Sequence, residues 1–526
     1  MTTEPGTRPV DGATSYANDG RIPIRPSYAA EAVTDPPAVA AWRQARLKSG
    51  GPFRPRYMVY SGLGSPEMTA ERLEALQEVG AESFLLAADL PSQLGFDPDH
   101  ELAHAQVGRA GVSCATLEDF RTICSRLDLT AADSVGMLAN SVGHIGMGMV
   151  SSVLQDRGAA QVKLVMQNDP LKEFTARGTE IYEPGQALRI ACDCVAHAID
   201  EDVPGVALTV CSNHYDVAGA GPVLALAFAF ANAIAYVDEL ARRGYEVARI
   251  CGKLMFFLNE RSDLFAEAAL FRTARSIWSD ILHERYAVPF CDQPVATLMG
   301  YAHGLESADE PLVNLPRVTL SVLASVIGGV DYLCATGYDE ALRIPSVDAA
   351  ALAVRTMQVV GNEHGAAATI DPLVGSAKLR DIEDYLQTTV RLELERVASA
   401  GGAIAAVTSG YAKRRIDENR GERERQLAAG ERVMVGTNAY RATARQNWFA
   451  GRSSGEINFV RVEEQAKKAI AAHKADRDDG AVRSALSEVT GAAAGPDNLL
   501  PPTIAALRAG ATGEEIVRAT GEGFAA

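Results

Sequence analysis

The chain has 526 residues, 47% of them hydrophobic, so it can bury a large core and is longer than one ordinary domain. Its formal net charge of −17 argues against nucleic-acid binding, because that affinity comes from clustered Lys and Arg that neutralise phosphates. The longest apolar stretch, Gly219 to Val237, is interrupted by Gly, Pro and Asn and predicts a buried helix rather than a membrane span. The N-terminus carries no export signal and the eight cysteines are scattered, so we expect reduced thiols in a cytoplasmic protein.

Residues 1–40 differ in texture from the rest of the chain. They are rich in Pro, Gly, Thr and Asp and show no apolar periodicity. Such a composition predicts an extended N-terminal arm that gains order only by lying against something else.

Residues 55–345 alternate between two patterns. Eight short β-rich runs are each followed by a helical stretch or a loop that leads to one: YMVYSG, ESFLLAADL, SVGMLAN, QVKLVMQN, GVALTVC, KLMFFLN, PVATLMG and DYLCATG. This count and length predict a (β/α)8 TIM barrel over residues 41–385. A doubly wound open sheet is the competing fold, but no GxGxxG follows the first run and eight units overfill such a sheet.

Beyond about residue 385 the β-rich runs stop. Charged amphipathic patterns take over, including residues 382–398, 413–428 and 460–476. We therefore predict a helical C-terminal region over residues 386–526.

Five segments carry a resemblance to a known family. They are VYSG (59–62), AADLPSQLGFD (87–97), MQNDPLKEFTARGTEIY (166–182), NHYDVAGAG (213–221) and IDPLVGSA (370–377). In order and spacing they resemble the signature segments of the cobalamin-dependent acyl-CoA mutases, the methylmalonyl-CoA mutase family. The resemblance implies an isomerase that uses adenosylcobalamin for a radical 1,2-rearrangement of an acyl thioester carbon skeleton.

The same resemblance gives roles to four residues at expected strand ends, where barrel active sites lie. Tyr60 matches a tyrosine beside the substrate that helps displace the adenosyl group, and Gln167 matches a glutamine that contacts the reacting substrate. Arg177 matches the arginine that pairs with the free carboxylate of methylmalonyl-CoA, a group that suits the guanidinium fork. His214 matches the histidine that hydrogen-bonds the migrating thioester carbonyl. Each alone could be ordinary structure, but their joint occurrence at matching separations favours a functional site. Family members that act on monocarboxylic acyl groups differ at the tyrosine and arginine positions, so Tyr60 with Arg177 favours a dicarboxylic acyl substrate.

Other positions depart from the family pattern. Lys253 stands where an arginine usually meets the coenzyme A phosphates, and Thr336 stands where an asparagine is usual. Glu340 corresponds to a glutamate that contacts the adenosyl ribose. Residues 296–300, ATLMG, replace a pattern close to R-x-H-x-Q. These changes leave two alternatives open: a mutase that acts on a carrier-protein-linked thioester, or a non-catalytic homologue that serves as a binding scaffold.

The cofactor domain of the family has no counterpart that we find in this sequence. Its D-x-H-x-x-G motif is missing, whereas residues 498–524 resemble the helical linker that leads into that domain. We therefore expect adenosylcobalamin to be bound mainly by a separate small cobalamin-binding subunit, in a hetero-oligomer.

One motif points to a different class. His100-Glu101-Leu102-Ala103-His104 matches H-E-x-x-H, in which two imidazoles on one helical face bind zinc. Pro98 and Asp99 begin the stretch and Gly108 follows closely, which indicates a loop. We assign no metal site, and a zinc assay would decide the matter.

Overall fold

The structure is a computed structural model that describes residues 15–16, 23–24, 37–49, 54–260, 263–304, 307–441 and 457–526. Most of the predicted arm of residues 1–40 lies outside the described residues. Within it, β1 (Ser15–Tyr16) and β2 (Pro23–Ile24) pair in antiparallel fashion. Helix α1 (Pro37–Ser49) follows and packs on the barrel through Trp42. The Cζ atom of the buried Arg275 guanidinium lies 4.6 Å from the centroid of the Trp42 ring.

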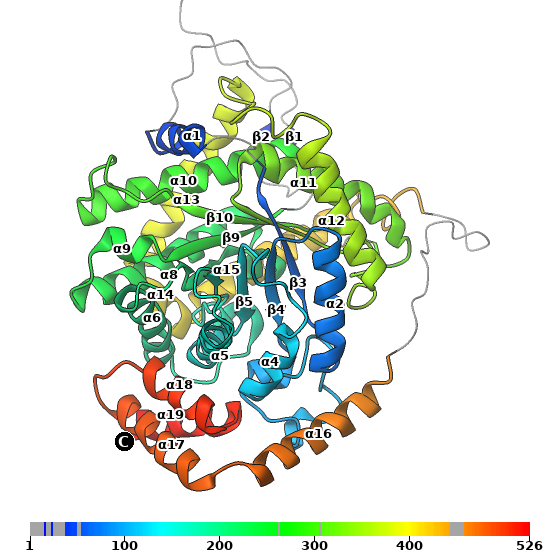
Figure 1. The fold of residues 1–526 in the computed structure, drawn as a ribbon. Coiled ribbons are helices and arrows are strands. Elements are labelled where there is room, and N and C mark those ends of the chain that lie inside the picture. The colour runs from blue at the N-terminus through cyan, green and yellow to red at the C-terminus, as the bar shows by residue number, and fades with distance from the viewer. Residues whose placement is uncertain are drawn as a thin grey trace, which may run out of the picture.

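The remaining strands form one parallel sheet with the spatial order β7-β6-β5-β4-β3-β11-β10-β9-β8 (Figure 1). The strands are β3 (Arg56–Ser61), β4 (Ser83–Ala87), β5 (Ser134–Leu138), β6 (Lys163–Val165), β7 (Gly205–Val206), β8 (Leu208–Cys211), β9 (Leu254–Glu260), β10 (Thr297–Ala302) and β11 (Tyr332–Ala335). Each of the eight predicted β-rich runs overlaps one of these strands or, in the case of GVALTVC, two.

The two ends of this sheet meet in a single interrupted strand. Only Ala207 separates β7 from β8, and β7 pairs with β6 while β8 pairs with β9. The Thr209 amide also donates to the Met166 carbonyl at 2.9 Å, so β8 is tied back toward β6. The sheet therefore closes into an eight-stranded barrel, which confirms the (β/α)8 prediction over the open-sheet alternative.

One long helix follows each strand of the barrel and covers its outside (Figure 1). These helices are α2 (Pro66–Glu78), α4 (Leu117–Cys124), α5 (Gly143–Asp156), α6 (Pro184–Asp200), α8 (Gly221–Arg242), α10 (Leu264–Tyr286), α11 (Asn314–Gly328) and α12 (Val347–Asn362). Their starts follow from local sequence: the Ser65 hydroxyl accepts from the Met68 amide at 3.3 Å, and Pro66 occupies the first turn of α2.

Short elements lie in the connecting loops. They are α3 (Leu90–Gln93), η1 (Glu101–Ala103), η2 (Asn140–Val142), η3 (Glu173–Arg177), α7 (Ser212–Val217), α9 (Val247–Cys251) and η4 (Pro311–Val313). All but α9 follow a strand directly or within the loop beyond it, so they help to build the rim at the carboxyl ends of the strands.

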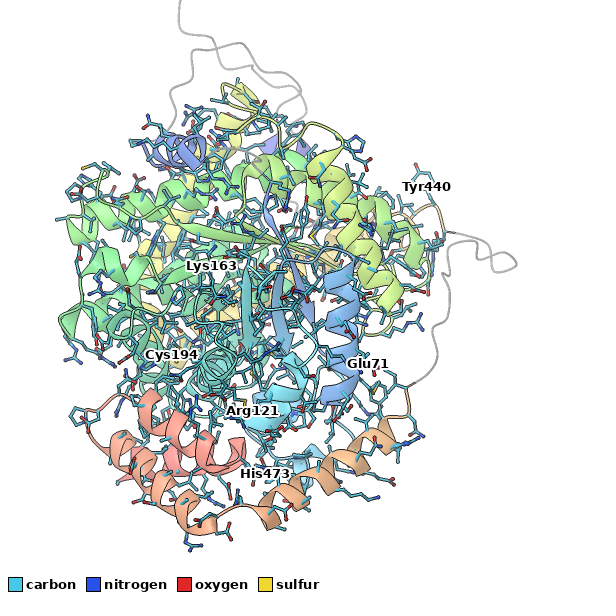
Figure 2. All side chains as sticks on the ribbon, in the orientation of Figure 1. Glu71, Arg121, Lys163, Cys194, Tyr440 and His473 are labelled. Carbon is cyan, nitrogen blue, oxygen red and sulfur yellow. The ribbon has the colours of Figure 1, made fainter. Side chains whose placement is uncertain are left out.

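Side chains fill both the barrel interior and the layer between strands and helices (Figure 2). Because strand side chains alternate, one set points inward. This inner set is apolar and includes Met58, Leu85, Val165, Phe257 and Met299. The opposite faces of the strands pack beneath the helices in a much larger apolar cluster.

Two helices in the described part of the chain are long and apolar enough to span a membrane by composition, α8 and the segment Pro311–Gly328. In α8, 72% of the most apolar window is buried inside the fold. The stretch around Gly219 to Val237 is thus a buried barrel helix, as its Gly, Pro and Asn interruptions predict.

The C-terminal helices continue from the barrel. Helices α13 (Ala377–Ser399), α14 (Gly402–Thr408) and α15 (Tyr411–Ala428) lie on its surface, and α13 packs on α8 and α10. The expected boundary at residue 385 falls inside α13, which packs on the outer helices of the barrel.

Helices α16 (Phe459–Asp476), α17 (Asp479–Ala494), α18 (Leu500–Ala509) and α19 (Gly513–Ala525) gather beside α4 and α5 (Figure 1). Ion pairs and hydrogen bonds fasten them there. Lys474 of α16 pairs with Asp97 at 2.9 Å, and the Gly513 amide donates to the Ala115 carbonyl at 2.8 Å. His473 of α16, labelled in Figure 2, has its Nε2 2.8 Å from the Gly510 carbonyl oxygen.

Candidate active site

The carboxyl ends of the strands bring four predicted site residues to one rim of the barrel. Tyr60 is the penultimate residue of β3, and Gln167 lies two residues beyond β6. Arg177 ends η3 in the loop after β6, and His214 lies in α7, directly after β8. Residues separated by more than 150 positions thus face the same end of the barrel, where barrel enzymes place their active sites.

Gln167 is held by its backbone and left unpaired at its side chain. Its carbonyl accepts from the amides of Ala139 and Asn140 at 2.9 and 3.0 Å. Gln167 is 1% exposed, yet within the described part of the chain neither its amide oxygen nor its amide nitrogen has a hydrogen-bond partner. A buried amide with both ends unpaired is costly unless a bound molecule satisfies it.

His214 is neutral in this environment. Burial, together with the positive charges of Lys172 and Arg177, holds its pKa well below the ordinary histidine value. Its Nδ1 has no partner among the described residues. Helix α7 is fixed from β9, because Asn259 donates to the Asp216 carboxylate at 2.7 Å. His214 can therefore offer a hydrogen bond from a neutral ring rather than a proton from an imidazolium.

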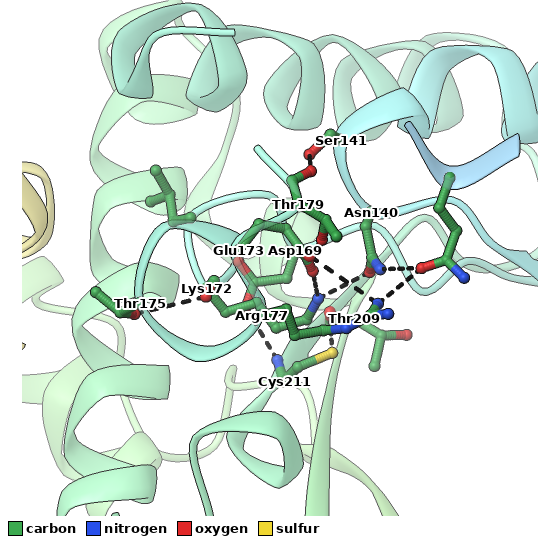
Figure 3. A network of polar contacts seen from close by, with 12 residues as sticks. Asn140, Ser141, Asp169, Lys172, Glu173, Thr175, Arg177, Thr179, Thr209 and Cys211 are labelled. Carbon is green, nitrogen blue, oxygen red and sulfur yellow. Dashed lines mark hydrogen bonds and ion pairs between the residues drawn. The ribbon is translucent and has the colours of Figure 1, made fainter. Parts of the chain in front are cut away.

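Arg177 is positioned by a buried network (Figure 3). It ends the π-helical turn η3, which Gly178 closes with a φ of 70°, a left-handed conformation that suits glycine. Glu173, in the same turn, is fully buried and bonds to the Lys172 ammonium and the Thr179 hydroxyl. The Arg177 side chain itself remains 25% exposed, so it can meet a ligand.

Aromatic side chains surround the inner part of the rim. The rings of Tyr60 and Tyr301 lie edge to face with centroids 6.5 Å apart. Tyr301 also contacts Phe257 at 5.8 Å and His303 at 5.8 Å. Burial raises the pKa of the Tyr60 hydroxyl, an effect that the Arg177 charge opposes, so the hydroxyl stays protonated at neutral pH.

Glu340 follows β11 and faces this aromatic group. The Tyr301 hydroxyl donates to its Oε1 at 2.9 Å, and the Gly337 amide donates to its Oε2 at 3.2 Å. Burial raises the Glu340 pKa to about 7 despite these hydrogen bonds. Thr336 lies nearby, but its hydroxyl contacts the Ala302 carbonyl and the Gly304 amide, each at 3.3 Å, and so ties the ends of β10 and β11 together.

Lys253 does not join the other predicted site residues. It immediately precedes β9, so it lies at the amino end of the barrel, whereas Tyr60, Gln167 and His214 lie at the carboxyl end. Its ammonium donates to the Val203 carbonyl, and its own carbonyl accepts from the amides of Ala207 and Leu208. The sequence pattern misplaced it because KLMFF is the start of the strand rather than the loop after it.

The seventh strand also differs from its prediction. β10 covers residues 297–302, so the segment 296–300 consists of the residue before the strand and its first four residues, and Leu298 and Met299 are buried. Tyr301 and His303 stand at its carboxyl end instead. They are functional candidates that the sequence reasoning missed, and the alternation YAH after the apolar run was the signal that could have found them.

The H-E-x-x-H motif forms no zinc site of the helical kind. Its middle is the three-residue 3-10 turn η1, and the His100 ring stacks on Phe96 with centroids 4.3 Å apart. The His104 Nδ1 instead contacts the Glu463 carboxylate at 2.8 Å. Across the part of the chain that the structure describes, no group of three or more His, Cys, Asp or Glu could hold a metal ion.

A closed (β/α)8 barrel with unpaired polar side chains at the carboxyl ends of its strands is a barrel of the enzyme type, with its site at that rim. The chain belongs to the methylmalonyl-CoA mutase family, whose sequence model matches residues 55–526. The members that give this family its name are isomerases, specifically intramolecular transferases.

Three relatives illustrate the range of the family. The chain is 28% identical over 518 residues to the 2-hydroxyisobutanoyl-CoA mutase large subunit of Aquincola tertiaricarbonis, covering 95% of this chain and 90% of that protein. It is 30% identical over 511 residues to methylmalonyl-CoA mutase of Cereibacter sphaeroides, covering 94% and 70%. It is 30% identical over 443 residues to ethylmalonyl-CoA mutase of Methylorubrum extorquens, covering 82% of this chain and 64% of that protein.

Proposed function

We propose that this chain is the catalytic large subunit of an adenosylcobalamin-dependent mutase that rearranges the carbon skeleton of a dicarboxylic, methylmalonyl-CoA-like acyl thioester. The observation that carries the proposal is the rim itself. Tyr60, Gln167, Arg177 and His214 meet there, and the buried amide of Gln167 and the Nδ1 of His214 have no hydrogen-bond partner among the residues that the structure describes. Unsatisfied donors and acceptors beside a partly exposed arginine are what an acyl thioester with a free carboxylate would fill.

The three polar residues divide the work on the substrate. Arg177 binds the free carboxylate and so fixes the acyl group at one end. His214, neutral because of its burial and its cationic neighbours, donates a hydrogen bond to the thioester carbonyl and stabilises the negative charge that gathers on that oxygen. The side-chain amide of Gln167 donates hydrogen bonds to, and accepts them from, the polar atoms of the substrate that lie between the carboxylate and the thioester carbonyl.

The residues of the rim also fit the adenosyl part of the cofactor. Glu340 accepts one hydrogen bond on each carboxylate oxygen, from Tyr301 and from the Gly337 amide, which leaves acceptor capacity for a ribose hydroxyl. When bound, adenosylcobalamin supplies the radical chemistry that side chains lack. Tyr60, Phe257 and Tyr301 would shield the reacting atoms from water and solvent thiols. The Thr336 hydroxyl is already bonded to the Gly304 amide and the Ala302 carbonyl, so this residue would affect cofactor binding only by fixing the conformation of the loop.

A separate small cobalamin-binding subunit completes the proposal. The relative from Aquincola tertiaricarbonis is named a large subunit, and this chain covers 90% of it. The proposed assembly is therefore a hetero-oligomer. All eight cysteines are free thiols and seven are buried, which fits the reducing cytoplasm that we propose as its location.

The scaffold alternative loses its main support. It rested on missing polar residues at 296–300, but residues 297–300 form the first part of β10, and Tyr301 and His303 lie at and just beyond the end of that strand. A thioester on a carrier protein remains a second substrate form, because Lys253, the expected partner of the coenzyme A phosphates, lies at the other end of the barrel.

The test combines the purified chain, its small cobalamin-binding subunit, adenosylcobalamin and a panel of acyl thioesters without oxygen. The panel contains mono- and dicarboxylic acyl groups on coenzyme A and on a carrier protein. We expect a cob(II)alamin-radical signal in the electron paramagnetic resonance spectrum with a dicarboxylic member only. Silence across the panel, with the two chains demonstrably associated, would contradict a catalytic function.

A further inference from the structure

We infer that Gln93, on the loop after β4, is a positioning residue that sets how Arg177 presents its guanidinium and so decides the preference for a carboxylate-bearing acyl group. The inference rests on the proposed function, since it takes Arg177 as the carboxylate partner. It adds a residue from a different strand and a specific edge of the guanidinium.

The contact between the two side chains is short and its direction is fixed. Arg177 Nη1 donates to Gln93 Oε1 at 2.8 Å. The other end of the same amide, Nε2, donates to the Ala88 carbonyl at 2.7 Å, so the oxygen must face the arginine. Asn140 adds a second donor to that oxygen at 3.4 Å, while its own oxygen accepts from the Lys172 ammonium at 2.8 Å.

The loop that carries Gln93 is rigid. Gln93 is 5% exposed and is the last residue of α3, whose first turn is capped by the buried Asp89 through the Ser92 amide at 2.9 Å. The second oxygen of Asp89 accepts from the Gly108 amide at 2.8 Å and ties down the far end of the loop. A side chain held at both ends of its amide, on a capped turn, cannot follow the arginine if the arginine moves.

These contacts involve only the Nη1 side of the Arg177 guanidinium and leave its Nε and Nη2 side available to a ligand. Both protein acceptors near Arg177, Gln93 at 2.8 Å and Glu173 at 3.9 Å, lie at Nη1. Among the described residues no acceptor contacts Nε or Nη2, and these two atoms form the side of the fork that can grip a carboxylate with two parallel bonds. Because Gln93 is neutral, it orients the guanidinium without cancelling the charge that the ligand needs.

The matched substitutions are Gln93→Leu, which removes the acceptor, and Gln93→Glu, which keeps the shape and adds a negative charge. Gln106→Leu and Gln106→Glu are the controls, because Gln106 is exposed on the same loop. The probes are succinyl-CoA and butyryl-CoA, which have four-carbon acyl groups and differ in the terminal carboxylate. Isothermal titration of the full chain gives both dissociation constants, and thermal unfolding checks that each variant is folded.

We expect the wild-type chain and both Gln106 variants to prefer succinyl-CoA. The preference should fall about 10-fold in Gln93→Leu, as for loss of one hydrogen bond to a charged group, and about 100-fold in Gln93→Glu, where the new carboxylate occupies Arg177. A folding defect would weaken both thioesters together and leave their ratio unchanged.

The outcomes separate the two proposals. A wild-type chain that shows no preference for the succinyl group, or that binds neither acyl group on coenzyme A or on a carrier protein, would overturn Arg177 as the carboxylate partner and with it the dicarboxylic substrate. A clear wild-type preference that survives both Gln93 substitutions would overturn the positioning role of Gln93 and leave the proposed function in place.

Discussion

The stability of the protein should fall between pH 5 and pH 8 through Glu340, and Glu340→Gln should remove that fall. The pKa of Glu340 is about 7 in the folded chain, against an ordinary value of 4.5. The folded state therefore binds this proton more tightly than the unfolded state does. Stability from the protonated carboxyl is complete below pH 4.5 and is lost as the pH rises through about 7.

The size of the effect follows from the two pKa values. Integrating the linkage between pH 5 and pH 8 gives about 2.5 kcal/mol of lost unfolding free energy, at 1.36 kcal/mol for each pKa unit. With about 2.1 cal/mol/K of unfolding entropy per residue over 526 residues, this corresponds to a shift of about 2 °C in Tm. Subtracting the Tm of the wild type from that of Glu340→Gln at each pH cancels the other titrating groups.

The assay is thermal unfolding of both proteins and of Glu363→Gln, an exposed control, at half-unit pH steps. The Tm difference for Glu340→Gln should rise steadily from pH 5 to pH 8, and the control difference should stay flat. A difference for Glu340→Gln that is constant, or that grows toward acid, would refute the assignment of a raised pKa to this carboxyl.

Three other predictions test separate parts of the structure. Arg177→Gln should lower kcat/KM for a dicarboxylic acyl thioester by an amount equivalent to about 2 to 5 kcal/mol of activation free energy. The loss should lie nearer the lower figure because the Arg177 side chain is 25% exposed. An equal loss of kcat/KM for a monocarboxylic thioester would contradict carboxylate binding by Arg177. His214 should stay neutral, so its ring signals in nuclear magnetic resonance should not titrate between pH 5 and pH 8. A titration midpoint near pH 6.5 would contradict the lowering of its pKa by burial. Gly136→Ala should lower Tm sharply or prevent folding, because the new Cβ would lie 1.5 Å from the Val165 carbonyl oxygen. Gly185→Ala on α6 is the control: its new Cβ would have nothing within 4 Å, so Tm should be unchanged or slightly higher. Similar Tm values for the two variants would show that β5 and β6 are not so closely packed.

Much of the fold could be read from the order of local patterns. The run SVGMLAN predicts β5, and the charged amphipathic pattern over residues 460–476 predicts α16 to within one residue. These elements can be predicted because strands and helices repeat apolar residues at different periods, and the period depends only on residues that are close together in the sequence. The predicted strand PVATLMG was less accurate, since β10 begins at Thr297 and extends to Ala302. A buried strand is apolar along its whole length, so periodicity does not mark where it ends.

The candidate site could be predicted only in part for the same reason. Motif spacing nominated Tyr60, Gln167, Arg177 and His214, and the strand ends do bring them to one rim. The same reasoning placed Lys253 with them, but Lys253 lies before β9, at the opposite end of the barrel. A sequence pattern misses this difference, because an error of a few residues in the position of a strand moves a side chain from one end of the barrel to the other.

The alternation of eight strand and helix units, the family resemblance and the four residues that carry it follow from the sequence alone, because each depends on residue types at short separations. The closure of the barrel through the interrupted strand at Ala207, and the contact of Gln93 with Arg177 across 84 positions, are visible only in the folded chain. Contacts between distant residues depend on how strands align in the barrel and how loops fold back over it. Those arrangements are set by the packing of the whole chain, which no local pattern records.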